Sequence, residues 1–219
     1  MATKNVRYLR TTCVLFYCCL ISSCATISPP SISSTKSQQV LIVKPVKDFY
    51  ATLEMFEYVN NSWQLIMGPL PAVVGRSGIA LAGVKKEGDG FTPSGIFDLP
   101  FAFGYNASIE TGLDYRQATD EDFWVDDVNA AQYNQWVHGK PQAQSYEVLR
   151  RNDVLYRQAI VIGYNMSPIV KGAGSAIFLH HWKNYHHSTS GCVAISQRHL
   201  RKLMAKLDKN KNPMIEIYP

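Results

Sequence analysis

A cysteine near the C-terminal end of the chain follows two histidines at a spacing that suits a nucleophile and its base. Cys192 comes after Ser190 and Gly191 and opens an apolar segment, whereas His180 and His181 end an apolar run of strand length. A free thiol has a pKa of ~8.5, so little of it is thiolate at neutral pH. A nearby imidazole can take the proton and hold the thiolate as an ion pair. These residue types therefore suit acyl transfer.

The same residues leave two questions open. Cys192 has a second interpretation as a small buried hydrophobic residue, which is the commoner case for a lone cysteine. Alternate residues of a strand face opposite sides, so His180 and His181 cannot both face Cys192 if the strand continues through them.

Gly191 permits a sharp turn or a close approach to a substrate, and backbone N–H groups beside it could cradle an oxyanion.

Three separated stretches resemble motifs of one enzyme family. They are GVKKEGDGFTPSGIF at residues 83–97, the segments at residues 122–127, 133–134 and 161–165, and the run at residues 175–196 that contains His180 and Cys192. From about Gln39 to Pro219 the chain is therefore similar to L,D-transpeptidase catalytic domains, the YkuD family. In that family a strand histidine precedes a Ser/Thr-x-Gly-Cys turn.

The resemblance implies both a fold and site residues. The fold is mainly β, a YkuD-like β-sandwich with one or two helices and a long irregular insertion. Cys192 matches the nucleophile, and His180 matches the histidine of the family's Phe-Leu-His pattern. The residues that would shape the substrate and oxyanion site are Thr189, Ser190 and Gly191.

The reaction implied by the resemblance is a peptidoglycan acyl transfer. The cysteine would form a thioester with a tetrapeptide stem and pass it to an acceptor amine, which creates a 3-3 cross-link without any metal or organic cofactor. A monomer is expected. One alternative is an L,D-carboxypeptidase or endopeptidase that hydrolyses the same thioester. A second is a non-catalytic lipoprotein that binds the cell wall, because Thr189 and Ala194 stand where many members carry serine and arginine.

The first residues have the layout of a bacterial export signal. Lys4, Arg7 and Arg10 precede an apolar run at residues 11–21. The run is shorter than the ~20 residues that span a bilayer, so a cleaved signal at residues 1–23 is the better interpretation than a transmembrane helix. Ile-Ser-Ser-Cys ending at Cys24 resembles a lipobox, which would make Cys24 the lipidated first residue of the mature protein.

A tethered periplasmic domain follows from this interpretation. Residues 29–39 are rich in Pro, Ser and Gln. This composition predicts a flexible tether at residues 24–38, and residues 39–219 are expected to form the catalytic domain. The lipid would be the only attachment to a membrane, and Ala25 after the lipidated cysteine favours the outer membrane. Cys192 would then have no disulfide partner in an oxidising compartment, which supports catalysis over packing.

Charge and histidine spacing argue against other ligands. Without the three basic residues of the signal, the excess of positive charge falls from five to two, and no basic stripe predicts nucleic-acid binding. The paired histidines at 180–181 and 186–187 do not have the spacing of ordinary zinc sites, so no metal is expected.

Local patterns predict several elements of the domain. Residues 50–59 and 63–67 predict a hairpin around an Asn-Asn-Ser turn, with a break at the following prolines. Ser196 is a candidate N-cap of a helix with an apolar stripe, and residues 214–217 predict a final strand. Trp124, Tyr133 and Trp136 either line a substrate groove or anchor the insertion. Residues 145–151 suggest a short helix whose arginines face solvent.

Overall fold

The mainly β expectation is confirmed by the computed structural model, which describes residues 30–33, 35–153 and 155–219. Its one α-helix is α1 (Gln197–Met204), and a 3-10 turn η1 (Lys209–Lys211) follows. The strands are β1 (Gln39–Lys47), β2 (Tyr50–Val59), β3 (Ser62–Val73), β4 (Ile79–Ala80), β5 (Thr92–Pro93), β6 (Gly95–Asp98), β7 (Ala102–Gly104), β8 (Tyr115–Gln117), β9 (Asp122–Val125), β10 (Trp136–His138), β11 (Tyr146–Val148), β12 (Gln158–Val161), β13 (Phe178–His181), β14 (Val193–Ile195) and β15 (Met214–Ile217).

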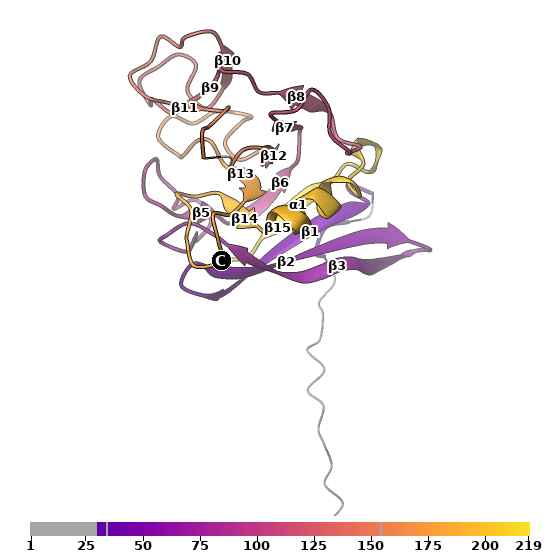
Figure 1. The fold of residues 1–219 in the computed structure, drawn as a ribbon. Coiled ribbons are helices and arrows are strands. Elements are labelled where there is room, and N and C mark those ends of the chain that lie inside the picture. Colours follow the sequence, from indigo (N-terminus) through magenta and orange to yellow (C-terminus); the bar gives the residue numbers. More distant parts are fainter. Residues whose placement is uncertain (1–29, 34, 154) are drawn as a thin grey trace, which may run out of the picture.

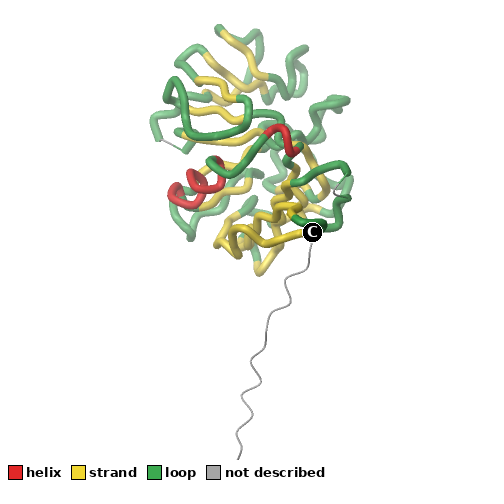
Figure 2. Tube along the Cα trace, turned by 90° about the vertical axis from the view of Figure 1, so that its right-hand side faces the viewer, coloured by secondary structure: helices red, strands yellow, loops and turns green. Residues whose placement is uncertain are grey.

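Ten strands form one strongly curled sheet in the order β6-β15-β1-β2-β3-β14-β13-β12-β7-β8. Only residues 99–101 separate β6 from β7, although β6 is the first strand of that order and β7 is the last but one. A link of this length spans at most ~14 Å, so the sheet has to fold back on itself. Figures 1 and 2 show the resulting layers, with α1 lying across the curl.

The predicted hairpin is confirmed, but the predicted break after it is wrong. β2 and β3 pair antiparallel from Val59 opposite Ser62 to Tyr50 opposite Val73, and β3 continues through Pro69 and Pro71. Proline is tolerated at bulges and on edges of sheets, where no ladder hydrogen bond is lost. The β2–β3 pairing shifts register near these residues, and β14 pairs only with the last two residues of β3.

Of the three hydrophobic clusters among the described residues, two surround the candidate site. The larger cluster joins the inward side chains of the curled sheet to α1, and includes Leu41, Leu53 and Leu179. The second is mostly aromatic, and Phe103, Phe178 and Cys192 belong to it. The nucleophile candidate therefore lies at the side of the sheet that faces the aromatic cluster.

The helix begins as the sequence predicts. The Ser196 side chain accepts a hydrogen bond from the His199 N–H, which satisfies one of the free donors at the helix start. Leu200, Leu203 and Met204 are buried against the curled sheet. The apolar stripe is therefore core packing, and it fixes the segment that follows Cys192.

We expect Leu203→Ala to lower the free energy of unfolding by about 2–5 kcal/mol, because the side chain is fully buried and its removal leaves a cavity. Denaturant unfolding measures this loss. Lys202→Ala on the exposed face of the same helix is the matched control and should change stability by less than about 0.5 kcal/mol. Equal losses in both variants would contradict the packing role of the stripe.

The insertion contains a small sheet, and the helix suggested for residues 145–151 is wrong. β9 pairs on one side with β10 and on the other with β11, which occupies part of that segment. The Tyr146 ring lies on Phe123 across the pair, with centroids 5.0 Å apart. Cross-strand packing of this kind outweighs a weak local helix preference. This correction matters because β11 carries Glu147 into the candidate site.

The described part of the predicted tether lies against the domain. Ile32 is buried with Val40, Ile42 and Phe56, and the Ser31 hydroxyl donates to the Glu216 carboxylate at 2.5 Å. Residues 1–29, which include the predicted signal and Cys24, lie outside the described residues. Within the described residues, no helix has the length and apolar content needed to cross a membrane.

Candidate active site

Parallel pairing of β13 with β14 brings the cysteine beside the histidine strand. Leu179 pairs with Val193 and His180 with Ala194, so Cys192 lies next to Phe178 at the start of this ladder. The Phe178 N–H donates to the Cys192 sulfur at 3.4 Å, and the thiol donates to the Ala176 carbonyl oxygen at 3.3 Å. The sulfur is thus held by backbone groups of β13 and of the segment just before it.

The two histidines face opposite sides of β13. Phe178 belongs to the aromatic cluster with Cys192, whereas Leu179 belongs to the larger cluster on the other side. His180 lies two residues after Phe178 on the strand, so its side chain faces the same side, and it lines the same pocket as Cys192. His181 borders a separate hollow near Trp182. This placement favours His180 as the partner of the thiol.

His180 has the tautomer that a base needs. Its Nδ1 lies 2.9 Å from the carbonyl oxygen of His181, and because a carbonyl only accepts, Nδ1 carries the proton. The lone pair is then on Nε2. Burial lowers the pKa of His180 to about 4, although the carbonyl partner opposes this shift. The imidazole is therefore neutral at pH 7.

The thiol is also neutral in the resting site. Burial raises the pKa of Cys192 to about 12, and the negative charge of Glu147 adds to the rise. The sequence suggested a preformed thiolate and imidazolium pair. The buried site instead stabilises a neutral pair, because charged forms lose their hydration there. Proton transfer to Nε2 would accompany nucleophilic attack.

Two threonines hold the turn that presents Cys192. The Thr189 hydroxyl donates to the Cys192 carbonyl oxygen at 2.6 Å and accepts from the Gly191 N–H at 3.1 Å. Thr92 of β5 donates to the same carbonyl at 3.3 Å. Gly191 has a φ of 152°, and a side chain there would press on the Phe91 carbonyl oxygen at 3.0 Å. The Thr189 hydroxyl can thus make the hydrogen bonds that hold the turn, at the position where many family members have serine.

The Gly-rich stretch at residues 83–95 forms one wall of the site. The buried Lys85 donates to the Asp89 carboxylate and to the Lys86 carbonyl oxygen, both at 2.7 Å. A Cβ on Gly174 would lie 3.2 Å from the Lys85 ammonium nitrogen. This ion pair fixes the loop against the segment that leads into β13.

The segment before β13 is held by side chains from the insertion. The Asn134 carboxamide oxygen accepts from the Ala176 N–H at 3.1 Å, which positions the carbonyl that receives the thiol. Glu87 accepts from the Ser175 hydroxyl at 2.7 Å and from the Tyr133 hydroxyl at 2.5 Å. The family-like motifs are therefore joined by hydrogen bonds around the loop before β13.

The aromatic residues of the insertion serve as anchors. Trp124 and Tyr133 are each 1% exposed, and the Trp124 N–H donates to Asn134 at 2.9 Å. Trp136 packs edge-on against Phe103, with ring centroids 5.5 Å apart. They line no part of the pocket around Cys192. The groove interpretation of these three residues is therefore wrong, and the anchoring interpretation holds.

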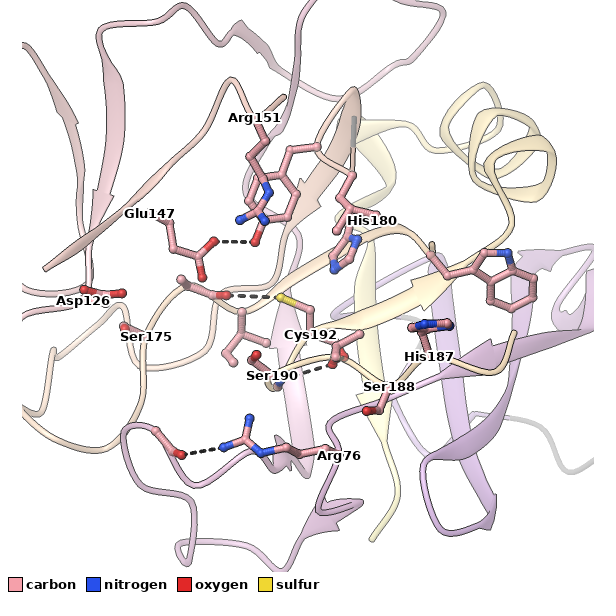
Figure 3. Close-up of a pocket in the computed structure, with 18 of the residues that line it drawn as sticks. Arg76, Asp126, Glu147, Arg151, Ser175, His180, His187, Ser188, Ser190 and Cys192 are labelled. Atoms are coloured by element: carbon pink, nitrogen blue, oxygen red, sulfur yellow. Dashed lines mark hydrogen bonds between the residues drawn. The ribbon is translucent and has the colours of Figure 1, made fainter. Parts of the chain in front are cut away.

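A pocket of about 590 Å³ contains Cys192, His180 and the turn of Thr189, Ser190 and Gly191. Figure 3 shows Glu147 and Asp126 on one side of Cys192 and His180 on the other. The sequence did not predict three charged residues that line this pocket, namely Asp126, Glu147 and Arg151. All three belong to the insertion. The alternation of side chains at residues 146–148 could have predicted a strand there, and this was the only pattern in the sequence that pointed to Glu147.

Two further histidines follow β13. His187 also lines the pocket, with its Nδ1 2.8 Å from the Asn184 carboxamide oxygen, and His186 lies 3.4 Å from the Tyr50 hydroxyl. Among the described residues, no three His, Cys, Asp or Glu side chains lie close enough together to hold a metal ion. The chemistry that this arrangement supports is nucleophilic attack by sulfur with an imidazole as proton acceptor.

The curled sheet thus brings a buried thiol and a neutral imidazole into one pocket. The YkuD family, the L,D-transpeptidase catalytic domain, matches residues 48–215, and the chain belongs to this family. Among solved structures, the helical cell shape determining protein Pgp2 from Campylobacter jejuni is similar at 15% identity and a TM-score of 0.40, over 83% of this chain. The match covers 48% of that chain, about half its length. Comparison with curated proteins gave no match.

Proposed function

We propose that the chain is a peptidoglycan L,D-transpeptidase that uses Cys192 as nucleophile and His180 as base. The observation that carries the proposal is the shared pocket, in which the thiol and a neutral imidazole with a free Nε2 lie on one side of β13 and β14. Membership of the YkuD family supports a cell-wall peptide as substrate.

The proposed reaction has two acyl-transfer steps. The Cys192 sulfur attacks the carbonyl carbon of the third residue of a tetrapeptide stem, and the thiol proton passes to His180 Nε2. The bond to the terminal D-amino acid breaks, its amine takes the proton from His180, and a thioester remains. An acceptor amine attacks this thioester, loses a proton to His180, and the thiol forms again.

The oxyanion of each step needs N–H donors. The Gly191 N–H is already engaged by Thr189, whereas the Cys192 N–H has no acceptor among the described residues. We assign the Cys192 N–H as the principal donor, with Thr189, Ser190 and Gly191 shaping the turn around it. A donor of this kind is worth about 10²–10³ in rate in other acyl-transfer enzymes.

Intact-protein and product mass spectrometry after incubation with disaccharide-tetrapeptide tests this function. An acyl adduct on Cys192 together with a cross-linked dimer is the expected result. An adduct with only tripeptide product would replace transfer with hydrolysis of the same thioester. Folded protein with a free thiol, but without adduct and product, would overturn the proposed reaction and favour a wall-binding role.

We also propose export and lipid attachment at Cys24, with the domain in the periplasm and the outer membrane as the favoured site. The support is the signal-like layout of residues 1–23 and the lipobox-like residues before Cys24. We expect Cys24→Ala to prevent lipidation of the protein and to release the protein from the membrane fraction. Metabolic labelling with a fatty-acid analogue and membrane fractionation measure both effects. Unchanged labelling would refute this attachment.

A further inference from the structure

Tyr156 lies beside both members of the proposed pair. It is 5% exposed and comes just before β12. Its ring meets the His180 ring edge-on, with centroids 5.2 Å apart and an interplanar angle of 78°, and it meets Phe178 in the same manner at 5.4 Å. Tyr156 thus limits the orientation of the imidazole from the side of the aromatic cluster.

The Tyr156 hydroxyl is bonded to one acceptor and shares its pocket with a second. It donates to the Glu147 carboxylate at 2.5 Å, the bond drawn from Glu147 in Figure 3. Tyr156 and Cys192 line the same pocket and belong to the same hydrophobic cluster, and a hydrogen bond from Tyr156 would lower the pKa of the Cys192 thiol. Burial raises the pKa of Tyr156 well above its usual range, so the hydroxyl keeps its proton and acts as a donor. The Tyr156 hydroxyl can therefore donate either to the Glu147 carboxylate or to the Cys192 sulfur.

The Glu147 carboxyl group lines the same pocket as Cys192. Burial raises the pKa of Glu147, and the hydrogen bond from Tyr156 and the charge of Arg151 oppose that rise. The charges of Asp126 and Glu87, which also line the pocket, raise the pKa of Glu147 further. The Arg151 guanidinium also lies over the Tyr156 ring, 5.2 Å from its centroid. The carboxyl group of Glu147 is therefore held by Tyr156 and Arg151, at an end of the pocket where most charged side chains are acidic.

The charge of Glu147 acts on the nucleophile. After burial, it is the largest influence that raises the pKa of Cys192, while the Phe178 N–H, Tyr156 and the buried Lys85 ammonium lower it. While Tyr156 is bonded to Glu147, the thiolate form of Cys192 is therefore disfavoured for two reasons. The charge of Glu147 repels the thiolate, and the Tyr156 hydroxyl that would stabilise the thiolate is occupied.

We propose that Tyr156 and Glu147 are positioning residues that control when the Cys192 thiol ionises, with Glu147 holding the Tyr156 hydroxyl in the resting site. Neutralising Glu147 releases this hydroxyl to donate to the sulfur. The thiol proton then passes to His180 Nε2, Tyr156 keeps its own proton, and no other bond changes. The inference rests on the proposed function only in taking Cys192 as the nucleophile.

The test measures alkylation of Cys192 by iodoacetamide in the full-length protein, followed by mass spectrometry of the Cys192 peptide between pH 7 and 10. Glu147→Gln removes the charge and leaves only a weaker, neutral acceptor, so the Tyr156 hydroxyl is released to donate to the sulfur. We expect it to shift the pH profile to lower pH, so that alkylation at pH 8 is about three- to tenfold faster. Adding Tyr156→Phe to this variant removes the donor and should slow alkylation by about tenfold relative to Glu147→Gln.

Controls separate charge control from packing. Glu121→Gln makes the same chemical change at an exposed residue outside the pocket and should leave the profile unchanged. Thermal melting reports folding, and Glu147→Ala replaces the glutamine variant if that one does not fold. Packing damage would move both Glu147→Gln and the double variant in the same direction. Such a result, or an unchanged profile in Glu147→Gln, would overturn the inference.

Failure of this inference is distinguishable from failure of the proposed function. Alkylation needs no peptidoglycan, so the predicted opposite shifts would stand even if no peptide product formed. A cross-linked product with unchanged alkylation profiles would reject the control by Tyr156 and Glu147 and leave the transpeptidase intact.

Discussion

Cys192→Ala is expected to abolish acyl transfer, with a fall of at least about 10³ in the rate of product formation from disaccharide-tetrapeptide. The reason is that the sulfur is the only atom of the proposed mechanism that bonds to the substrate. The side chain is 7% exposed and small, so the variant should retain the fold. Product mass spectrometry and a thermal melt of the same preparation measure the two effects.

The matched control for this change is Cys192→Ser, which keeps the shape of the side chain but replaces the sulfur with a smaller and more polar oxygen. A hydroxyl is a much weaker nucleophile than a thiol at neutral pH, so this variant should also lose nearly all turnover. Cross-linked dimer or tripeptide produced by folded Cys192→Ala at a rate near that of the native chain would disprove cysteine catalysis.

His180→Ala should lower the rate of thioester formation by about 10²–10⁴, because the thiol then has no adjacent base at neutral pH. The neutral state of the native pair makes this loss large, since the thiol with a pKa of about 12 has to give up its proton during attack. Single-turnover formation of the Cys192 adduct measures this step directly.

His181→Ala is the matched control, because both histidines are 6% exposed and both changes remove the same side chain. His181 lies on the other side of β13 and borders a different hollow, so we expect a much smaller loss of activity. Thermal melting of both variants separates activity from stability. A larger loss of activity in His181→Ala, at equal stability, would show that the base was assigned to the wrong imidazole.

Local patterns predicted the elements that form from neighbouring residues. The hairpin of β2 and β3, the N-cap at Ser196 and the final strand β15 follow from turn residues, capping chemistry and periodicity, which depend on a few adjacent positions. The wrong predictions have the opposite origin. β3 tolerates its prolines because of bulges and an open edge, and β11 forms because β9 lies beside it.

By itself, the sequence determined that a strand histidine precedes a glycine turn with a cysteine, and it identified the motifs that the family shares. Only the tertiary structure decided which histidine faces Cys192, because this depends on the register of β13 against β14. It also brought Glu147 and Tyr156 into the pocket of Cys192 and left the pair of Cys192 and His180 neutral. The physical reason is that burial and charge at a site arise from residues distant in the chain, which the sheet has to curl to bring together.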